Sequence, residues 1–171
     1  MASQMDRTGL APFFQGDNLV VRLKGKDPTR AFIFNGHLDV VHIGEAEDWK
    51  HDPFSGDIVD GRIYGSGSSD MKSGVLAIME AGEALLKAGT PPTDVWLTFV
   101  PREELDGEGS RQFTKWFKDE GHLDRYKDIA ALFAEPTSLE DAHYGHRGNF
   151  FVEAEKKGMA GHASRPEDIK P

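Results

Sequence analysis

Apolar residues occur in short runs separated by polar turns, and these runs predict a series of β-strands. Residues 18–25 (NLVVRLKG) alternate apolar and polar side chains between turn residues, which is typical of a short strand. A turn is predicted at residues 26–30 (KDPTR). The apolar run at residues 31–36 (AFIFNG) then predicts a strand with His37 at its carboxyl end.

Two later apolar runs have the same form, because polar residues follow each of them at once. Residues 95–100 (VWLTFV) predict a strand that is followed by Glu103 and Glu104. Residues 129–137 (IAALFAEPT) predict a third buried strand, and Glu135 lies at its end. Each of these strands therefore delivers an acidic side chain to its carboxyl end.

The segments between the predicted strands show helical periodicity and one hairpin signal. Residues 71–88 predict a helix with Asp70 before it and Gly89 as its stop, and residues 110–121 predict a second helix. Residues 56–65 place an Asp-Gly pair between two short apolar pairs, which indicates a β-hairpin. The three- and four-residue spacing in the first helix involves Val75, Ile78, Met79, Gly82, Leu85 and Leu86.

Strands that alternate with helices predict an α/β sandwich. In open sheets of this kind, functional groups collect beyond the carboxyl ends of the strands. We therefore expect His37, Glu103, Glu104 and Glu135 to converge there. From Tyr144 the sequence changes to one alternating strand and a glycine-rich turn.

Composition and charge narrow the classes of function. The chain has 171 residues, of which 38% are hydrophobic, enough for one core with a small appendage. Its formal net charge of -9 repels nucleic acids and anionic membranes, although the acidic groups could also surround cations. Because the chain has no cysteine, a metal site would use His, Asp and Glu. Residues 1–17 contain no leader or spanning segment, so a cytoplasmic location is expected.

Each candidate residue also has an ordinary structural explanation. The HLD of residues 37–39 could be a capped loop, and Glu135 could simply end a strand. Glu103 and Glu104 could belong to a solvated acidic loop. Asp70 could cap the helix that follows it, because its carboxylate can accept an N–H of the first turn.

Taken together, the same residues favour a metal site. They lie at strand or helix ends on one side of one predicted sheet. Two zinc-like ions about 3.5–4 Å apart need a bridging carboxylate, further nitrogen and oxygen ligands, and a free carboxylate that takes a proton from the bridging water. The chain offers candidates for nearly all of these groups.

Five motifs follow one another in the order and spacing of the M20 metallopeptidases, which the chain resembles from about residue 18 to its end. The resemblance is to the branch that includes acetylornithine deacetylase, succinyl-diaminopimelate desuccinylase, carboxypeptidase G and the aminoacylases. It implies a three-layer αβα sandwich with a mixed, largely parallel sheet over residues 1–143, and the start of an α+β lid and dimerisation domain at residues 144–171. The motifs are NGHLDVV at 35–41, WKHDPF at 49–54, DGRIYGSGSSDMKSG at 60–74, REELDGEGS at 102–110 and AEPT at 134–137.

The resemblance also implies an activity and a ligand set. The family hydrolyses an amide bond of a small N-acyl amino acid or short peptide with water activated by two divalent ions, for which zinc is suitable and cobalt or manganese are alternatives. Asp70 would bridge the ions. His37 and Glu135 would complete one ion, and Glu104 would contribute to the other.

Further roles follow from the same resemblance. Glu103 would be the general base, and Asp39 would hold the imidazole of His37 by its other ring nitrogen. The peptide between Asp70 and Met71 is expected to be cis. His162, in GHASRP, matches a lid histidine that supports the oxyanion across a homodimer. His42, His51, His122 and His143 match no ligand and are expected to be loop or surface residues.

The family pattern continues beyond both ends of this sequence. A complete member carries a further metal-binding histidine downstream, a whole lid domain and an opening helix that residues 1–16 cannot fully supply. We therefore expect a truncated chain that hydrolyses amides poorly or not at all. Two other interpretations stay open: a non-catalytic fragment or interaction module that keeps the fold, and an acidic α/β binding protein with accidental motifs.

Overall fold

A computed structural model describes residues 1–145, and within this range five strands form one mixed sheet. The strand order is β1-β2-β6-β3-β7. The parallel pairs are β3 with β6 and β3 with β7, whereas β2 is antiparallel to β1 and to β6. The strands are β1 (Pro12–Gln15), β2 (Asn18–Leu23), β3 (Asp27–His37), β6 (Thr93–Val100) and β7 (Asp128–Phe133).

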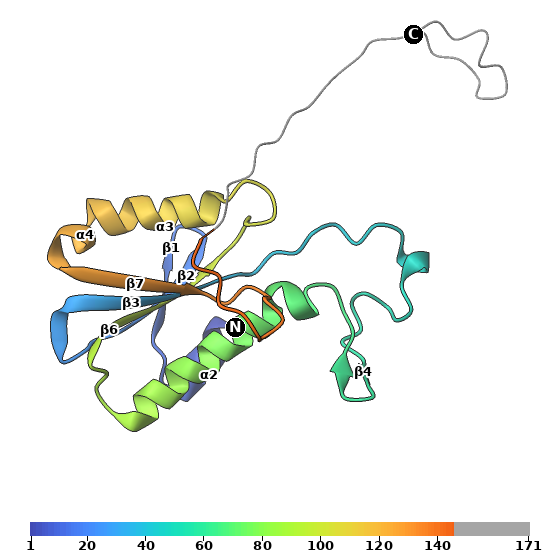
Figure 1. Ribbon diagram of the computed structural model, residues 1–171, viewed down its shortest axis with the longest axis horizontal. Coiled ribbons are helices and arrows are strands. Elements are labelled where there is room, and N and C mark those ends of the chain that lie inside the picture. Colours follow the sequence, from blue (N-terminus) through green and yellow to red (C-terminus); the bar gives the residue numbers. More distant parts are fainter. Residues whose placement is uncertain (146–171) are drawn as a thin grey trace, which may run out of the picture. The chain divides into compact units, whose positions relative to one another are not determined.

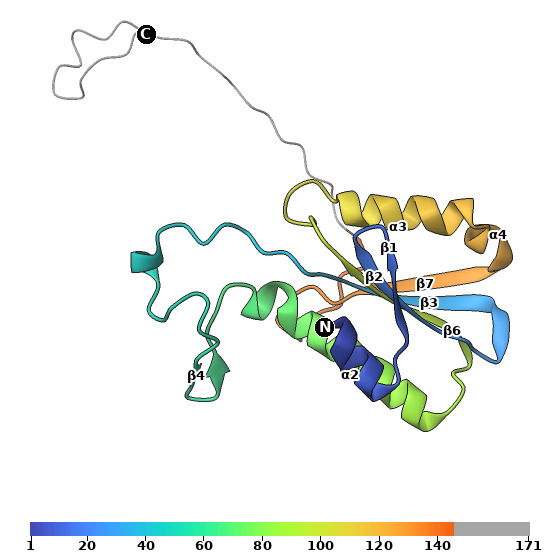
Figure 2. The same cartoon turned by 180° about the vertical axis from the view of Figure 1, so that it is seen from behind.

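Helices cover both faces of this sheet. Figures 1 and 2 show α2 on one face and α3 with α4 on the other. Buried residues form a separate hydrophobic core on each face, and α1 contributes to the core under α2. These layers confirm the predicted three-layer α/β architecture. The helices are α1 (Ala2–Thr8), α2 (Ser73–Ala88), α3 (Glu108–Asp119) and α4 (His122–Arg125).

Strand β6 supplies both cores because successive side chains of a strand point to opposite faces. Val95, Leu97 and Phe99 lie in the core under α2, whereas Trp96 lies in the core under α3. The ring of Trp96 meets that of His122 at a centroid distance of 5.0 Å, and burial lowers the pKa of His122. His122 was expected to be a loop or surface residue; it lies in the short helix α4 and is half-buried against an aromatic cluster.

Two strand predictions need correction. The predicted turn at residues 26–30 is part of β3, which begins at Asp27 and changes register between Asp27 and Ala31. The predicted strand at residues 129–137 is shorter, and all residues of β7 are exposed rather than buried. The physical reason for the exposure is the position of β7 at the edge of the sheet described here.

The first sixteen residues contain structure that the hydrophobic pattern did not predict. They form α1 and β1, and the side chains of Met5 and Leu10 are completely buried. Both side chains pack into the core under α2. A seven-residue helix has too little periodicity to be recognised, so its burial came from tertiary contacts.

The segment between β3 and α2 contains the predicted hairpin. Strands β4 (Ile58–Val59) and β5 (Arg62–Ile63) pair in antiparallel fashion around Asp60 and Gly61. Both turn residues have positive φ angles, 50° and 74°, as a two-residue hairpin turn requires. The helix α2 begins two residues later than predicted, after a wider turn at Ser68–Lys72.

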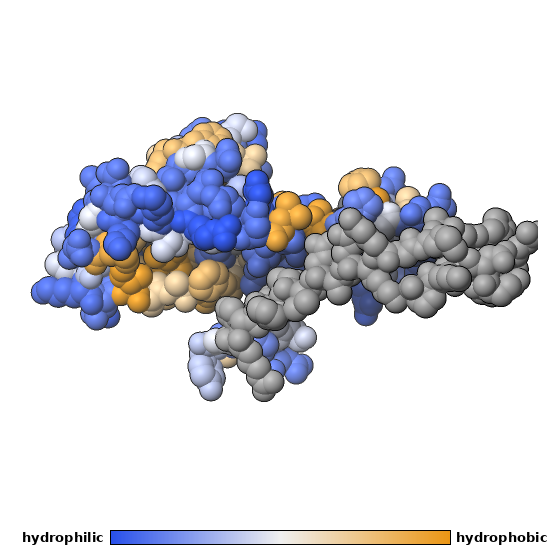
Figure 3. All heavy atoms as spheres, turned by 90° about the horizontal axis from the view of Figure 1, so that it is seen from above, coloured by the Kyte–Doolittle hydropathy of each residue, from blue (hydrophilic) through white to orange (hydrophobic). Residues whose placement is uncertain are grey.

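The chain divides into two units, Met1–Leu139 and Glu140–Pro171. The described residues of the second unit, 140–145, contain no helix or strand, and the predicted second domain at residues 144–171 stays a prediction. Among residues 1–145, none of the helices is long and apolar enough to cross a membrane. Figure 3 shows apolar patches on an otherwise hydrophilic surface, and the exposed apolar residues include Leu132 and Phe133 of β7.

Candidate metal centre

His37 lies at the carboxyl end of β3, as predicted, and its side chain is only 1% exposed. Its Nε2 atom lies 2.9 Å from Oδ1 of Asp70, and its Nδ1 atom lies 2.9 Å from the main-chain oxygen of Asp39. The backbone N–H of His37 donates to Sδ of Met71 at 3.0 Å. The imidazole is therefore held at both nitrogens, with Nε2 directed toward a carboxylate.

Asp70 occupies the wide turn before α2, where its backbone angles and those of Met71 are not helical. The peptide between these two residues is cis, as the family resemblance implied. No side chain caps either this turn or α2, so Asp70 is not the N-cap that its position also allowed. Its carboxylate is instead paired with His37.

Glu135 follows β7 by two residues and reaches the same place. The N–H of Ala134 donates to the main-chain oxygen of Asn35 at 3.1 Å, which keeps the chain beside β3 after the strand has ended. Oε2 of Glu135 then lies 3.8 Å from Nε2 of His37. Gly74 permits this arrangement, because a Cβ atom at residue 74 would lie 2.1 Å from the oxygen of Ala134.

Glu103 and Glu104 lie in the loop after β6, close to the same imidazole. Ligand atoms of His37, Glu103 and Glu104 all lie within 4.8 Å of one another, and so do those of His37, Asp70 and Glu135. The four predicted carboxylates are thus brought together around His37. Convergence of strand ends was the expectation, and the parallel pairing of β3 with β6 and β7 explains it.

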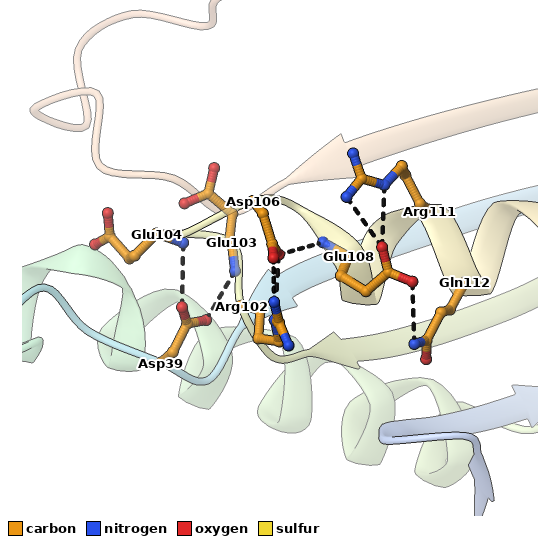
Figure 4. A network of polar contacts seen from close by, with 8 residues as sticks. All are labelled: Asp39, Arg102, Glu103, Glu104, Asp106, Glu108, Arg111 and Gln112. Carbon is orange, nitrogen blue, oxygen red and sulfur yellow. Dashed lines mark hydrogen bonds and ion pairs between the residues drawn. The ribbon is translucent and has the colours of Figure 1, made fainter. Parts of the chain in front are cut away.

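Asp39 makes different contacts from those predicted. Its carboxylate oxygen Oδ1 lies 3.7 Å from Nδ1 of His37, which is too far for a hydrogen bond. The main-chain oxygen of Asp39 takes that place, and the carboxylate accepts the backbone N–H groups of Glu103 and Glu104 (Figure 4). The sequence interpretation found the residue but assigned the wrong atom to the imidazole.

The electrostatics of the cluster are those of crowded carboxylates around an imidazole. Burial lowers the pKa of His37, but the hydrogen bonds with Asp70 and Asp39 and the charge of Glu135 outweigh it, so the pKa is raised. Burial and the neighbouring charge of Asp70 raise the pKa values of Glu104 and Glu135, although the charge of His37 opposes this. A cation would relieve this repulsion.

Sequence reasoning missed the contact between Met71 and His37, since a hydrogen bond from a backbone N–H to a distant thioether leaves no signal in a local pattern. His162 lies outside the described residues. His51 contacts Asp57 and Tyr64, and does not belong to either group of candidate ligands found among residues 1–145.

The fold is a three-layer α/β architecture. Near the carboxyl ends of its parallel strands, a buried histidine and four carboxylates form a candidate metal centre. Residues 33–160 match the model of peptidase family M20/M25/M40, and the chain belongs to this family. The family resemblance is thereby confirmed.

Similar relatives agree with this assignment, and solved structures share the fold. The chain is 35% identical over 172 residues to a succinyl-diaminopimelate desuccinylase of Cereibacter sphaeroides, and the match covers 98% of this chain but 43% of that protein. An M20 family metallo-carboxypeptidase of Sulfolobus solfataricus has a similar fold, with a TM-score of 0.62, 19% identity, and coverage of 75% of this chain and 30% of the other. Human carnosine dipeptidase 1 also has a similar fold, with a TM-score of 0.59 and 23% identity. That match covers 76% of this chain and 30% of the other.

Proposed function

We propose that this chain carries a large part of the active site of a two-metal amidohydrolase, which cleaves an amide bond of a small N-acyl amino acid or short peptide. The observation that carries the proposal is the position of one buried imidazole between two sets of carboxylates, Asp70 with Glu135 and Glu103 with Glu104. The names of the relatives favour an N-succinyl amino acid among such substrates.

The residues fit divalent ions. Ligand atoms around a four-coordinate zinc ion lie about 3.4 Å apart when each bond is about 2.0–2.2 Å long. The distances from Nε2 of His37 to Asp70 and Glu135 are 2.9 Å and 3.8 Å, which bracket that value. The nitrogen and oxygen donor set suits zinc, and cobalt or manganese could replace it.

In the proposed assignment, Asp70 would contribute to both ions, His37 and Glu135 would complete one, and Glu104 would contribute to the other. When bound, such ions lower the pKa of a shared water toward about 7 and polarise an amide carbonyl. The wide turn before α2 supports the bridging position of Asp70, because it directs the carboxylate to the imidazole and away from the helix backbone.

Glu103 is the proposed general base. Its side chain is exposed, and its ligand atom lies within 4.8 Å of those of His37 and Glu104. A carboxylate in that position can take a proton from the attacking water and pass it to the leaving amine. His162 is the proposed oxyanion partner from a lid domain, which we place at residues 144–171 and expect to mediate a homodimer of the full-length protein.

A second candidate is a non-catalytic fragment or interaction module. The exposure of every residue of β7 favours it, because a fully exposed edge strand can pair with another chain. This candidate predicts metal binding without turnover.

Zinc titration of the purified, metal-free protein separates the candidates. The enzyme predicts two ions per chain, and the fragment predicts one weakly bound ion at His37, Asp70 and Glu135. Asp70→Asn is expected to weaken all zinc binding. A wild-type chain that binds no zinc would contradict both candidates.

Hydrolysis of an N-succinyl amino acid by the same preparation tests the base. Glu103→Gln should retain zinc and lose at least about 100-fold in any turnover that the wild type shows. Glu108→Gln is the matched control, since Glu108 lies in the same acidic segment but pairs with Arg111. Equal losses in both variants would exclude the assigned role of Glu103.

A further inference from the structure

The carboxylate of Asp39 divides its two oxygens between two consecutive backbone amides. Oδ1 accepts the N–H of Glu103 and Oδ2 accepts the N–H of Glu104, each at 3.1 Å. Figure 4 shows both backbone nitrogens turned toward Asp39. In this two-point arrangement each oxygen serves one donor, which fixes the direction of both N–H groups as well as their distance.

The loop is shaped to receive this anion. Arg102 precedes the pair with a positive φ angle of 65°, in the left-handed region. Consecutive N–H groups that follow such a residue converge on one point and form an anion-binding concavity. The carboxylate of Asp39 occupies that point, although 64 positions separate Asp39 from Glu103.

The same residue also contacts the other half of the cluster through its main chain. Its carbonyl oxygen lies 2.9 Å from Nδ1 of His37. Leu38, between the two, donates its N–H to the main-chain oxygen of Val100 at 2.9 Å, so the ends of β3 and β6 are joined as well. Asp39 thus touches the imidazole with its backbone and the acidic pair with its side chain.

We propose that Asp39 is a positioning residue that holds the Glu103–Glu104 pair beside His37 through these two backbone hydrogen bonds. Glu103, Glu104, Asp70 and Asp39 itself are all acidic, and their mutual repulsion would move the loop away from the cluster. Hydrogen bonds from backbone N–H groups oppose this movement without placing a cation among the ligands.

Amide hydrogen exchange in the metal-free protein tests the positioning directly. The N–H groups of Glu103 and Glu104 should exchange at least about tenfold faster in Asp39→Ala than in the wild type. Asp39→Asn retains one acceptor oxygen, so one of the two amides should stay protected. The N–H of Leu38 should keep its protection in both variants, because a general loss of structure at the strand ends would expose it too.

Asp106→Asn is the matched control. Asp106 lies in the same loop, pairs with Arg102 and accepts the N–H of Glu108 at 3.0 Å. This variant should release the amide of Glu108 and leave those of Glu103 and Glu104 unchanged. Unchanged protection of both glutamate amides in Asp39→Ala would overturn the inference.

The consequence for metal binding rests on the proposed function and is measured separately. Zinc held by Glu104 should bind at least about tenfold more weakly in Asp39→Asn, whereas zinc at His37 should bind within about threefold of the wild type. The NMR signals of the His37 ring report zinc binding at the His37 position. A larger loss at His37 than at Glu104 would overturn the inference, because the carboxylate would then act through the imidazole. Absence of zinc binding in the wild type would refute the proposed function and leave the exchange result to decide the positioning.

Discussion

The Nε2 atom of His37 lies 2.9 Å from Oδ1 of Asp70, although 33 positions separate the two residues. The contact joins the end of β3 to the turn before α2, and Glu135 approaches the same nitrogen from the end of β7. Three segments of the chain therefore meet at one imidazole, which is where the metal-free and the metal-bound protein are expected to differ most.

Without metal, the protein should lose stability as the pH rises above neutrality. The pKa of His37 is raised, so its contribution is complete below the unfolded value of about 6.5 and disappears as the pH passes through the folded value. The raised pKa values of Glu104 and Glu135 act in the same direction, because the folded state disfavours their charged forms. Urea denaturation with a chelator, from about pH 6 to about pH 8, measures this loss.

Zinc should reverse that trend. Metal binding requires a neutral imidazole, so zinc affinity should rise with pH until His37 is deprotonated. Denaturation in saturating zinc should then show constant or increasing stability over the same pH range. His37→Gln should remove most of both effects, and a wild-type profile that is identical with and without zinc would contradict the prediction.

Gly74→Ala should impair the candidate metal centre even though alanine favours helices. The added Cβ would lie 2.1 Å from the backbone oxygen of Ala134, so α2 and the segment that carries Glu135 must separate. We expect a loss of about 1–3 kcal/mol in unfolding free energy and at least about tenfold weaker zinc binding.

Gly82→Ala in the same helix is the comparison for that variant. Its Cβ would meet Cδ1 of Leu97 at 2.5 Å, the far end of a side chain rather than a backbone atom. The loss should be below about 1 kcal/mol, with zinc affinity unchanged. Equal effects of the two substitutions on zinc binding would refute the importance of the close approach at Ala134.

Met71→Leu should lower the unfolding free energy more than an equivalent change elsewhere in the core. Met71 is fully buried, and its sulfur accepts the backbone N–H of His37, which leucine cannot do. Met79→Leu is the matched control in the same core. We expect the first variant to lose about 1 kcal/mol more in unfolding free energy, the cost of one unsatisfied buried donor. Equal losses would show that the thioether contact contributes nothing.

Asp94 should be essential for stability and not for zinc binding. Its side chain is 1% exposed and accepts hydrogen bonds from Arg22 at 2.8 Å, Gly25 at 2.8 Å and Tyr126 at 2.6 Å. Asp94→Asn should lose about 3 kcal/mol in unfolding free energy, because Arg22 keeps its charge without a partner. Asp128→Asn, which removes an exposed pair with Arg30, should lose less than about 1 kcal/mol.

Asp94 should also make the stability of the fold sensitive to acid. Burial raises the pKa of this carboxyl, but the hydrogen bonds from Gly25, Tyr126 and Arg22 lower it more, so the folded value lies below the ordinary one. Its stabilisation is complete above about pH 4 and is lost as the pH falls through the folded pKa. Acid denaturation followed by tryptophan fluorescence should show a smaller loss below about pH 4 in Asp94→Asn than in the wild type.

Short-range patterns in the sequence determined the order of the main strands and helices. Period-two and period-3.6 repeats depend on the local geometry of each element, so β2, β6, α2 and α3 were all predicted within a few residues. The ordered motifs also predicted the family, which the match over residues 33–160 confirms. The convergence of His37, Glu103, Glu104 and Glu135 followed from the rule that parallel strand ends share one edge.

Tertiary structure alone decided which atoms meet. The carboxylate of Asp39 turned to two backbone amides, and the sulfur of Met71 reached the N–H of His37. No local pattern encodes these contacts, because each depends on the relative height and direction of segments far apart in the chain. The exposure of β7 was decided in the same way, since a strand is buried by its neighbours and not by its own composition.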